Sequence, residues 1–488
     1  MHAESVADCK QEERSRTAET ESKTAEAAGG VFFWRINQAS YDGAGARAEE
    51  VLLTVLQRFG FQRVHELANA TLVWANCFEY KLWSAAGHCQ INHFPRSVEL
   101  SHKHRLCANL ARAGSPHLPP SFVLPQDRLA WLIALSHDPG PGPAAAALHA
   151  SSDPCESAET GRPGAHWIFK PGKAGGGRGV SVLHCDGTQG DVDRVLSLTD
   201  ASCTLKAPAV VTRYVERPLL INGRKVDLRL YTLVTSFHEL PSGAVSESNT
   251  ELDQLAVDAS TPMTAYIFTE GLVRFASEEY TLSPRLLDSP FVHLTNNEVN
   301  ARNMNRTATS SVCSGNWTLA MLWRWLRKHP LETMHEHDPL ESTWPRIRAL
   351  AFDVLDSARP TISSAMRGLA APPEAKDGRC FELFGLDVLL DEELRPWLCE
   401  VNSLPSLGIG GMVDVAVDMS MLTQMFTLVF GRAPCAPLEG KHHEAPASHC
   451  ATETQKLPAE AEAEHLQSDA AAAHFELLTA PSCFCERH

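Results

Sequence analysis

Two carboxylates and one amide stand in a pair of apolar segments, CFELFGLDVLL at 380–390 and WLCEVN at 397–402. Asp387 interrupts the first segment, whereas Glu400 and Asn402 lie two residues apart in the second, so they point to the same side of a strand. If 391–396 forms a turn and Leu390 faces Trp397, Asp387 lies directly opposite Glu400. Carboxylates this close repel one another unless a cation lies between them, and oxygen ligands on a rigid sheet suit Mg²⁺. A solvent-facing acidic strand end is the alternative.

A glycine-rich loop follows a short apolar segment that delivers a lysine. WIFK ends at Lys170, and AGGGRGV then leads into a second apolar segment at 180–183. Glycines let backbone N–H groups approach phosphate oxygens closely, while Lys170 and Arg178 would neutralise charge. No GK[ST] follows the glycines, so this is not the GxxxxGK[ST] phosphate loop. An ordinary glycine-rich hairpin explains the loop equally well when it is taken alone.

The segment at 223–234, GRKVDLRLYTLV, alternates as a half-buried strand does. Lys225, Asp227 and Arg229 share one face, and the apolar residues between them share the other. A solvated face of mutually paired ions is one interpretation, and a substrate-binding face is another. Together with the glycine loop and the carboxylate pair, the strand predicts a nucleotide-dependent transferase or ligase. Such a site needs no serine, cysteine or histidine nucleophile.

Strands and helices must position these residues, and their patterns alternate with polar segments along the chain. Ordered structure is predicted to begin near residue 31, with a helix at 49–58 and a strand at 70–74. Amphipathic helices are predicted at 316–328 and 343–369. The remaining segments are poor in large apolar residues, so we interpret them as disordered tails or surface insertions. They are 1–30, 137–165, 239–261 and the tail from 433 to 488.

Composition excludes several classes of protein. The 488 residues include 43 basic and 59 acidic side chains, so the formal charge of −16 argues against a general nucleic-acid binder. We find no uninterrupted apolar run of the about 18 residues that a membrane span needs, and no secretory signal at the N-terminus. The 14 cysteines form no CxxC pairs, which argues against structural zinc and favours reduced thiols in the cytoplasm.

The order of these motifs resembles the tubulin-tyrosine-ligase-like proteins, which have an ATP-grasp fold. The match covers most of the chain between residues 70 and 430, and NHFPRSVEL and FASEEY are similar to the glutamylating branch. The matching segments are NHFPRSVEL (92–100), WIFKP with GGGRGV (167–180), VVTRYVERPLLINGRKVDLRLY (210–231), EGLVRFA (270–276), HLTNNEVN (293–300) and FELFGLDVLLDEELRPWLCEVNSLPSL (381–407).

The resemblance implies an α/β (α+β) fold of three domains. They are an N-terminal preATP-grasp-like domain at 31–120, a central domain at 121–215 and a C-terminal catalytic domain at 216–432. ATP is expected between the central and C-terminal domains.

The resemblance also assigns roles to individual residues. The residues implied to contact ATP are Lys103, Lys170, Arg178, Gly179, Val180, Arg213, Tyr214, Val215, Lys225, Asp227 and Asn296. Those implied to act in catalysis are Lys225, Arg229 and Arg274. The implied Mg²⁺ ligands are Asp387, Glu400 and Asn402.

The implied activity is an ATP-dependent ligation of glutamate to the acidic tails of tubulin through an acylphosphate. ATP and Mg²⁺ are the expected cofactors, and free glutamate and microtubules are the expected partners of a monomer that binds neither nucleic acid nor membrane. The expected location is the cytoplasm and cytoskeleton, with the cilium, flagellum or basal body as candidates. The alternatives are a glycyl ligase, a ligase for another acidic protein, a small-molecule ATP-grasp ligase and a catalytically silent cytoskeletal adaptor.

Overall fold

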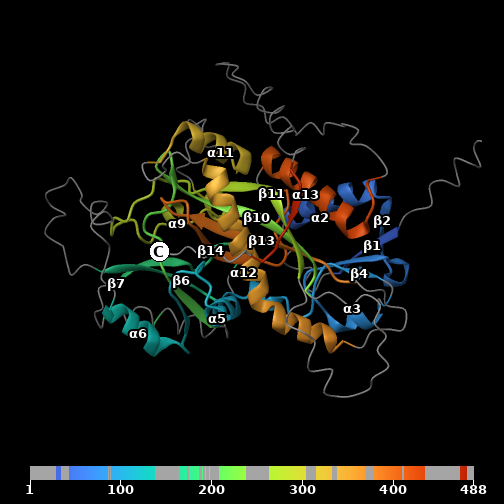
Figure 1. Cartoon of the computed structure of the whole chain (residues 1–488), viewed down its shortest axis with the longest axis horizontal. Coiled ribbons are helices and arrows are strands. Elements are labelled where there is room, and N and C mark those ends of the chain that lie inside the picture. The colour runs from blue at the N-terminus through green and yellow to red at the C-terminus, as the bar shows by residue number, and fades with distance from the viewer. Residues whose placement is uncertain are drawn as a thin grey trace, which may run out of the picture.

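A computed structural model describes most of the chain as a mixed α/β protein with three sheets (Figure 1). It describes residues 29–34, 43–137, 164–185, 208–237, 263–303, 315–331, 338–369, 379–434 and 473–480, together with the single residues 190, 193 and 197. Residues 86, 88, 173, 174, 409 and 410 within these ranges are not described. The first 28 residues of the predicted tail at 1–30 and nearly all of the predicted insertions at 137–165 and 239–261 lie outside the described residues. The last two residues of that tail belong to a strand, so the prediction is wrong there.

The first sheet contains four parallel strands in the order β2-β1-β3-β4. Parallel neighbours need a crossover connection, and α2 provides it between β1 and β2. The predicted helix at 49–58 and strand at 70–74 are both confirmed. The elements are β1 (Gly29–Trp34), α2 (Gly43–Arg58), β2 (Phe61–Val64), a 3₁₀ helix η2 (Leu67–Asn69), β3 (Leu72–Ala75), α3 (Tyr80–Ala85) and β4 (Gln90–Ile91).

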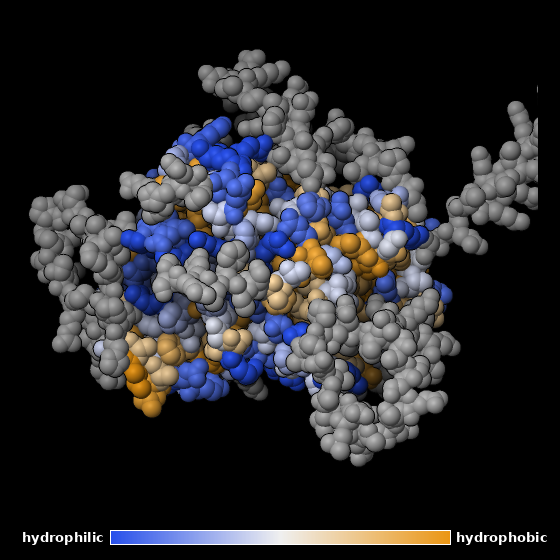
Figure 2. Space-filling model, in the orientation of Figure 1, coloured by the Kyte–Doolittle hydropathy of each residue, from blue (hydrophilic) through white to orange (hydrophobic). Residues whose placement is uncertain are grey.

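The second sheet contains four antiparallel strands in the order β5-β8-β6-β7, and the glycine-rich loop joins β6 to β7. Its small core includes Trp131 and Trp167, whose rings meet edge to face. Figure 2 shows apolar side chains gathered over α6, where Leu129 and Ile133 are exposed. The elements are α4 (Val98–Ser101), α5 (Lys103–Ala113), β5 (Ser121–Leu124), α6 (Arg128–His137), β6 (Ala165–Lys170), β7 (Ser181–Cys185) and β8 (Ala209–Arg213).

The largest sheet has seven strands, with β12-β11-β10-β13-β14 in order, β9 beside β10 and β15 beside β11. The predicted helices at 316–328 and 343–369 correspond to α11 and α12. The elements are β9 (Leu220–Ile221), β10 (Arg224–Ser236), β11 (Thr264–Phe275), α9 (Pro290–His293), α10 (Asn297–Asn300), β12 (Trp317–Thr318), α11 (Leu319–Lys328), α12 (Pro339–Arg367), β13 (Glu382–Leu390), β14 (Pro396–Asn402), α13 (Met412–Phe430) and β15 (Phe475–Leu477).

Helices cover both faces of this sheet and bury its apolar residues. One face packs against α11 and α12, whose leucines and isoleucines share a core with Val226, Leu228 and Leu230 of β10. The other face packs against α2 and α13 in a second core that contains Tyr231. Figure 1 shows α12 running along the sheet and α13 lying beside α2. Apolar burial on both faces fixes β10 and β13 at the centre of the molecule.

A buried ion pair joins the first sheet to the start of β13. His93 Nδ1 lies 2.7 Å from Glu382 Oε1, and the backbone N–H of Phe94 donates to Glu382 Oε2 at 2.9 Å. The other ring nitrogen of His93 lies 2.8 Å from the carbonyl oxygen of Ala75. Both ring nitrogens of His93 therefore have oxygen partners, one from β13 and one from the end of β3. This contact fixes β13 five residues before Asp387.

The predicted disorder of 433–488 is wrong for its last described part. Strand β15 pairs antiparallel with β11, the ring of Phe475 packs on Phe268, and Leu478 is buried in the core under α12. Trp344 of α12 also donates its indole N–H to Glu476 at 3.0 Å. A three-residue strand has too little periodicity to stand out in an Ala- and Glu-rich tail. It is stabilised by the sheet that it joins.

Among the described residues, α13 alone is long and apolar enough to cross a membrane by length and composition. Core helices pass the same test. One side of α13 packs into the core shared with α2, and its buried Asp414 and Asp418 hydrogen-bond to Asn316 and Tyr231. The helix therefore has the contacts of a core helix.

Candidate active site

The β13–β14 hairpin brings Asp387 directly opposite Glu400, as the sequence predicts. The pairing near the turn differs by one residue, because Leu390 lies opposite Pro396 rather than Trp397. Val388 pairs with Leu398 and Asp387 pairs with Glu400, so β14 has one extra residue between these pairs. This bulge restores the predicted pairing of Asp387 with Glu400. The bulged residue is Cys399, whose carbonyl oxygen takes part in the site described below.

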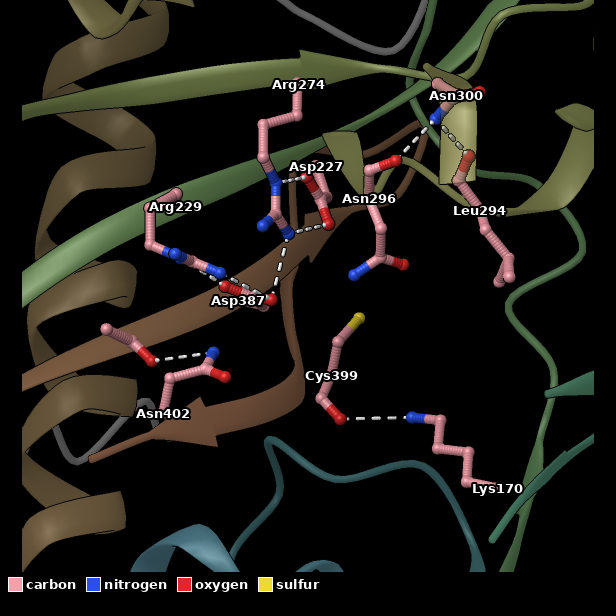
Figure 3. A network of polar contacts seen from close by, with 11 residues as sticks. Lys170, Asp227, Arg229, Arg274, Leu294, Asn296, Asn300, Asp387, Cys399 and Asn402 are labelled. Atoms are coloured by element: carbon pink, nitrogen blue, oxygen red, sulfur yellow. Dashed lines mark hydrogen bonds and ion pairs between the residues drawn. The ribbon is translucent and has the colours of Figure 1, made fainter. Parts of the chain in front are cut away.

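Two arginines hold the buried carboxylate of Asp387 (Figure 3). Arg229 donates from Nε to Oδ1 at 2.6 Å and from its terminal nitrogen to Oδ2 at 3.2 Å. Arg274 Nη2 lies 2.9 Å from the same Oδ2. Burial alone would raise the pKa of Asp387, but the two guanidinium charges outweigh it and hold that pKa well below its usual range. Asp387 therefore carries its negative charge whenever the protein is folded.

The same arginine network continues to the neighbouring strand pair. Arg274 donates to both oxygens of Asp227, at 2.8 and 2.5 Å. Asp227 lies opposite Arg274 in the β10–β11 register, and Arg229 lies opposite Asp387 in the β10–β13 register. Each of these residues is less than 10% exposed, so the ions are paired as expected but the interpretation as a solvated face is wrong. The network joins three adjacent strands of the largest sheet.

Two lysines reach the hairpin from outside the largest sheet. Lys170, at the end of β6, donates from Nζ to the carbonyl oxygen of Cys399 at 3.0 Å. Lys103, at the start of α5, forms an ion pair with Glu400 at 3.0 Å. Burial lowers the pKa of Lys170, and the charges of Lys103 and Lys225 lower it further, against the opposing effects of Cys399 and Glu400. The second sheet therefore supplies cations that face the carboxylates of the largest sheet.

The cluster carries more positive than negative charge. Among the described residues, its cations are Lys103, Lys170, Lys225, Arg229 and Arg274, and its carboxylates are Asp227, Asp387 and Glu400. These five cations exceed the three carboxylates by two positive charges. Excess charge of one sign in a mostly buried site is costly, so this arrangement suits a polyanionic ligand such as a triphosphate.

The oxygen atoms of the hairpin fit a magnesium ion. Asn402 donates its amide N–H to the carbonyl of Gly385 at 3.4 Å, which turns its own Oδ1 to the other side. That oxygen joins Asp387 and Glu400 as an all-oxygen donor set on two paired strands. Among the described residues, no three His, Cys, Asp or Glu side chains are grouped to hold a metal. Two carboxylates and an amide match Mg²⁺, which usually completes its coordination with waters and phosphates.

The glycine-rich loop packs against the segment after α9. Gly176 and Gly177 have positive φ angles of 62° and 70°. A Cβ on Gly176 would lie 2.3 Å from a Glu298 oxygen, and one on Gly177 would lie 3.1 Å from Asn296 Oδ1. A side chain at either position would therefore crowd its neighbour. Both backbone conformations also lie in the left-handed region, which favours glycine. In Figure 3 the amide of Asn296 points into the space shared with Cys399.

Other predicted residues lie around the cluster rather than within it. Arg178 folds back on its own loop, where Nε donates to the carbonyl of Gly175 at 3.2 Å, and Gly179 and Val180 complete that loop. Tyr214 joins the cluster through a hydrogen bond to Lys225, and Val215 directly follows it in the connection between the second and largest sheets.

Arg213 forms a separate network beside that connection. Its terminal nitrogen donates to Glu216 at 2.7 Å and to the carbonyl of His166 at 2.9 Å. Burial raises the pKa of Glu216, but hydrogen bonds from His166 and Arg213 outweigh it and lower that pKa to about 2. The Arg213 side chain thus stabilises the connection between the sheets and does not reach the carboxylate pair.

Sequence reasoning missed two contributors to this site. The carbonyl of Cys399 accepts a hydrogen bond from Lys170 at a bulge, and no residue type in the sequence predicts that bulge. His293 bonds Tyr214, and it begins the HLTNNEVN segment that contains Asn296. A histidine three residues before a predicted site residue is the available signal in the sequence.

Comparison with known proteins gives a family match over most of the chain. The sequence model described as the tubulin-tyrosine ligase family matches residues 82–241 and 255–438. All the site residues named above fall within these two ranges. Strand β15 falls outside them.

The chain is also similar to individual proteins, and the matched share is small in the two human proteins and large in the third. The chain is 28% identical to tubulin monoglutamylase TTLL4 of Homo sapiens over 404 residues, which cover 79% of this chain and 27% of that protein. It is 27% identical to tubulin polyglutamylase TTLL5 of Homo sapiens, covering 77% and 25%. It is 26% identical to a probable alpha-tubulin polyglutamylase, Ttll1, of Tetrahymena thermophila, covering 70% and 71%. The chain thus spans about a quarter of the length of the two human relatives.

Proposed function

The chain belongs to the tubulin-tyrosine ligase family, and from this membership we propose that it is an ATP-dependent ligase that adds glutamate to tubulin tails. The relatives' names, which include tubulin monoglutamylase and polyglutamylases, favour glutamate as the added amino acid. In this proposal the fold is an ATP-grasp fold with domains at 31–120, 121–215 and 216–432. ATP binds between the second sheet and the largest sheet.

The buried cluster of five cations and three carboxylates is the observation that carries the proposal. Its cations come from both sheets, so a triphosphate between them would contact each side. Lys103 and Lys170 are the proposed phosphate contacts from α5 and β6. The glycine loop, with Arg178, Gly179 and Val180, lies next to Asn296 and would cover the phosphates. Tyr214 and Val215 would contact the adenine.

The Mg²⁺ ligands in this proposal are Asp387, Glu400 and Asn402. When bound, Mg²⁺ would neutralise phosphate charge and polarise the γ-phosphoryl group as a Lewis acid. Lys103, which pairs with Glu400 in the structure, would then contact the nucleotide phosphates. The buried carboxylates and the arginines hold one another in place, so these charged side chains need to move little when substrates bind.

The proposed reaction has two displacements. A tail carboxylate attacks the γ-phosphorus and ADP leaves, which gives an acylphosphate. The amine of glutamate then attacks the acyl carbon, phosphate leaves and the amine nitrogen loses a proton. Lys225, Arg229 and Arg274 would orient the reacting carboxylates and stabilise the developing negative charge, so catalysis consists of positioning and electrostatics.

Label incorporation tests this proposal directly. Purified protein, Mg²⁺ and ATP would be incubated with microtubules and radiolabelled glutamate, glycine or tyrosine in separate reactions, beside a Glu400→Gln control. We expect label from glutamate alone, and its loss in the control. Mass spectrometry of the tubulin tails would then separate addition of the first glutamate from chain elongation.

Other outcomes identify the competing functions. Label from glycine alone would contradict the proposal and support a glycyl ligase. A folded protein that transfers no amino acid to microtubules but hydrolyses ATP with another acidic protein would move the activity to that acceptor. A folded protein that neither binds nor hydrolyses ATP would overturn the ligase assignment and favour a cytoskeletal adaptor.

A further inference from the structure

Tyr214, Lys225 and His293 form a hydrogen-bonded chain where the second sheet meets the largest sheet. The Tyr214 hydroxyl oxygen lies 2.9 Å from Lys225 Nζ and 3.0 Å from His293 Nδ1. Tyr214 follows β8, Lys225 lies in β10, and His293 ends α9. All three side chains are buried, with exposed fractions of 5, 7 and 3%. Three segments that are distant in sequence therefore meet at one phenol group.

The chemistry of the ammonium group fixes the direction of the first of these hydrogen bonds. An ammonium group only donates, so the phenol oxygen accepts from Lys225. For the second we assign the hydroxyl proton of Tyr214 to Nδ1 of His293, the arrangement in which a neutral ring carries its own proton on Nε2. Burial, and then the charge of Lys225, lower the pKa of His293 to about 4, which agrees with a neutral ring at physiological pH. The chain runs from Lys225 through Tyr214 to His293.

Ring packing prevents this arrangement from rotating. The Lys225 ammonium lies 4.5 Å from the centroid of the Tyr214 ring, so it contacts the ring face as well as the hydroxyl. The His293 ring stands edge-on to Tyr214 at 82° and to Tyr280 at 86°. Tyr280 is itself fixed, since its hydroxyl donates to the carbonyl of Glu216 at 2.7 Å.

Lysine has a long flexible stem and loses considerable rotamer entropy when it is held in one place. A residue that holds the ammonium before a ligand arrives removes this cost from ligand binding. Only one of the three ammonium protons is used by Tyr214, so two remain to face an anion. We propose that His293 is a positioning residue, which acts through Tyr214 to hold Lys225 ready for the anionic groups of the substrates. This inference rests on the proposed nucleotide site.

The experiment measures binding of a fluorescent ATP analogue with Mg²⁺ by anisotropy, together with KM for ATP, kcat and the melting temperature. Tyr214→Phe keeps the ring and removes the hydroxyl, and His293→Phe keeps an aromatic ring without an acceptor. Each is expected to weaken nucleotide binding by about tenfold, the loss typical of one hydrogen bond to a charged group. The rise should appear in KM for ATP more than in kcat.

Two further variants separate positioning from packing. The double variant Tyr214→Phe/His293→Phe should bind no more weakly than either single one, because both act through the same hydrogen-bonded chain. His293→Asn should bind within about twofold of the wild type, because its amide oxygen can accept where Nδ1 does. Tyr231→Phe is the matched control on the same strand, since it removes another buried tyrosine hydroxyl that bonds Asp418 and not Lys225. It should leave nucleotide binding unchanged.

Three results would overturn the inference. Variants that bind the analogue as tightly as the wild type, with lower melting temperatures only, would make the chain a packing feature. A His293→Asn protein as weak as His293→Phe would show that the acceptor is not what matters. A wild-type protein that fails to bind the analogue would remove the proposed nucleotide site itself, and the inference with it.

Discussion

Asp387 and Asp418 are buried carboxylates that contact the same face of β10, at Arg229 and Tyr231, but their environments differ. Two guanidinium groups hold Asp387 and keep its pKa well below the usual range. Asp418 accepts from the Tyr231 hydroxyl at 2.7 Å and from the backbone N–H of Gly408 at 2.5 Å. Burial and the nearby Asp414 raise its pKa to about 7, although these hydrogen bonds and Arg229 oppose the shift.

The difference shows what each of these two contacts is suited to, although Arg229 and Tyr231 lie only two residues apart in β10. A carboxylate between two arginines stays ionised, keeps its partners fixed and leaves positive charge available for a ligand. A carboxylate held mainly by neutral donors can take up a proton near neutral pH at little cost. The Asp387 contact therefore has the properties of a binding site, and the Asp418 contact has those of a helix–sheet contact.

The largest expected effect comes from removing the charge of Asp387. Asp387→Asn leaves Arg229 and Arg274 with one carboxylate fewer in a buried site, so we expect the free energy of unfolding to fall by about 3–5 kcal/mol. Glutamate incorporation should fall by at least about 100-fold, because preorganised charge is lost where the reaction develops charge. Denaturant unfolding and label incorporation measure the two effects.

Asp418→Asn is the matched control for this substitution. At pH 7 it should change the free energy of unfolding by about 1 kcal/mol or less, because Asp418 is already half protonated and the amide oxygen can accept one of its hydrogen bonds. Equal losses from the two variants would contradict the distinction between the Asp387 and Asp418 contacts of β10.

The charged face of β10 could be predicted from sequence because the alternation of a strand is local. The predicted pairing of Asp387 with Glu400 is confirmed, but not through the predicted turn, which is one residue too long; the bulge at Cys399, for which the sequence gives no signal, compensates for the difference. The contacts of Lys103 and Lys170 with the hairpin could not, because they depend on how the second sheet packs against the largest one. For Lys103 a family resemblance supplied the role, without the ion pair to Glu400 that the structure adds.

Other features gave no readable signal in the sequence. Asp418 stands in an apolar helix, and nothing in that segment identifies Tyr231 and Gly408 as its partners. Strand β15 has three residues in a polar tail, and its stability comes from the edge of β11. His293 packs against Tyr214, which is distant from it in sequence, and against Tyr280, from which a loop separates it. In each case long-range packing decides the outcome.

Stability against pH provides the second test. The pKa of Asp418 is about 7 in the folded protein, above the usual value for an aspartate, so the folded state holds a proton that the unfolded chain releases. Raising the pH from about 4 to about 7 should therefore lower the free energy of unfolding, by about 2–4 kcal/mol from this group, and leave its contribution constant above that range. Denaturant unfolding at several pH values measures this slope.

The control for this pH dependence is Asp418→Asn, in which the slope between pH 4 and 7 should become smaller by the contribution of one carboxylate. Asp387 contributes in the opposite direction, because its lowered pKa stabilises the folded state at higher pH and this stabilisation is lost only in acid. An unchanged slope in Asp418→Asn would show that Asp418 titrates as an ordinary aspartate.

A smaller effect is expected from Tyr231→Phe. The substitution removes the hydroxyl that donates to Asp418 Oδ1 and keeps the ring in its core, so the free energy of unfolding should fall by about 1–2 kcal/mol at pH 7. Because the hydroxyl lowers the pKa of Asp418, its loss should move the upper end of the pH-dependent range above 7. A full unfolding series against pH would detect both changes, and a range that ends at the wild-type pH would contradict the role of this hydrogen bond.

The smallest effect on stability is expected at the ion pair of Lys103 with Glu400, which is more exposed than the Asp387 and Asp418 contacts. Its side chains are 16 and 23% exposed, so Lys103→Met should change the free energy of unfolding by no more than about 1 kcal/mol. The same variant should weaken binding of Mg²⁺-ATP by about tenfold, since a phosphate contact is lost. Denaturant unfolding and nucleotide titration measure the two quantities on one protein. If stability fell and nucleotide binding did not, Lys103 would be a structural partner of Glu400, and this ion pair would resemble the Asp418 contact rather than a ligand-binding one.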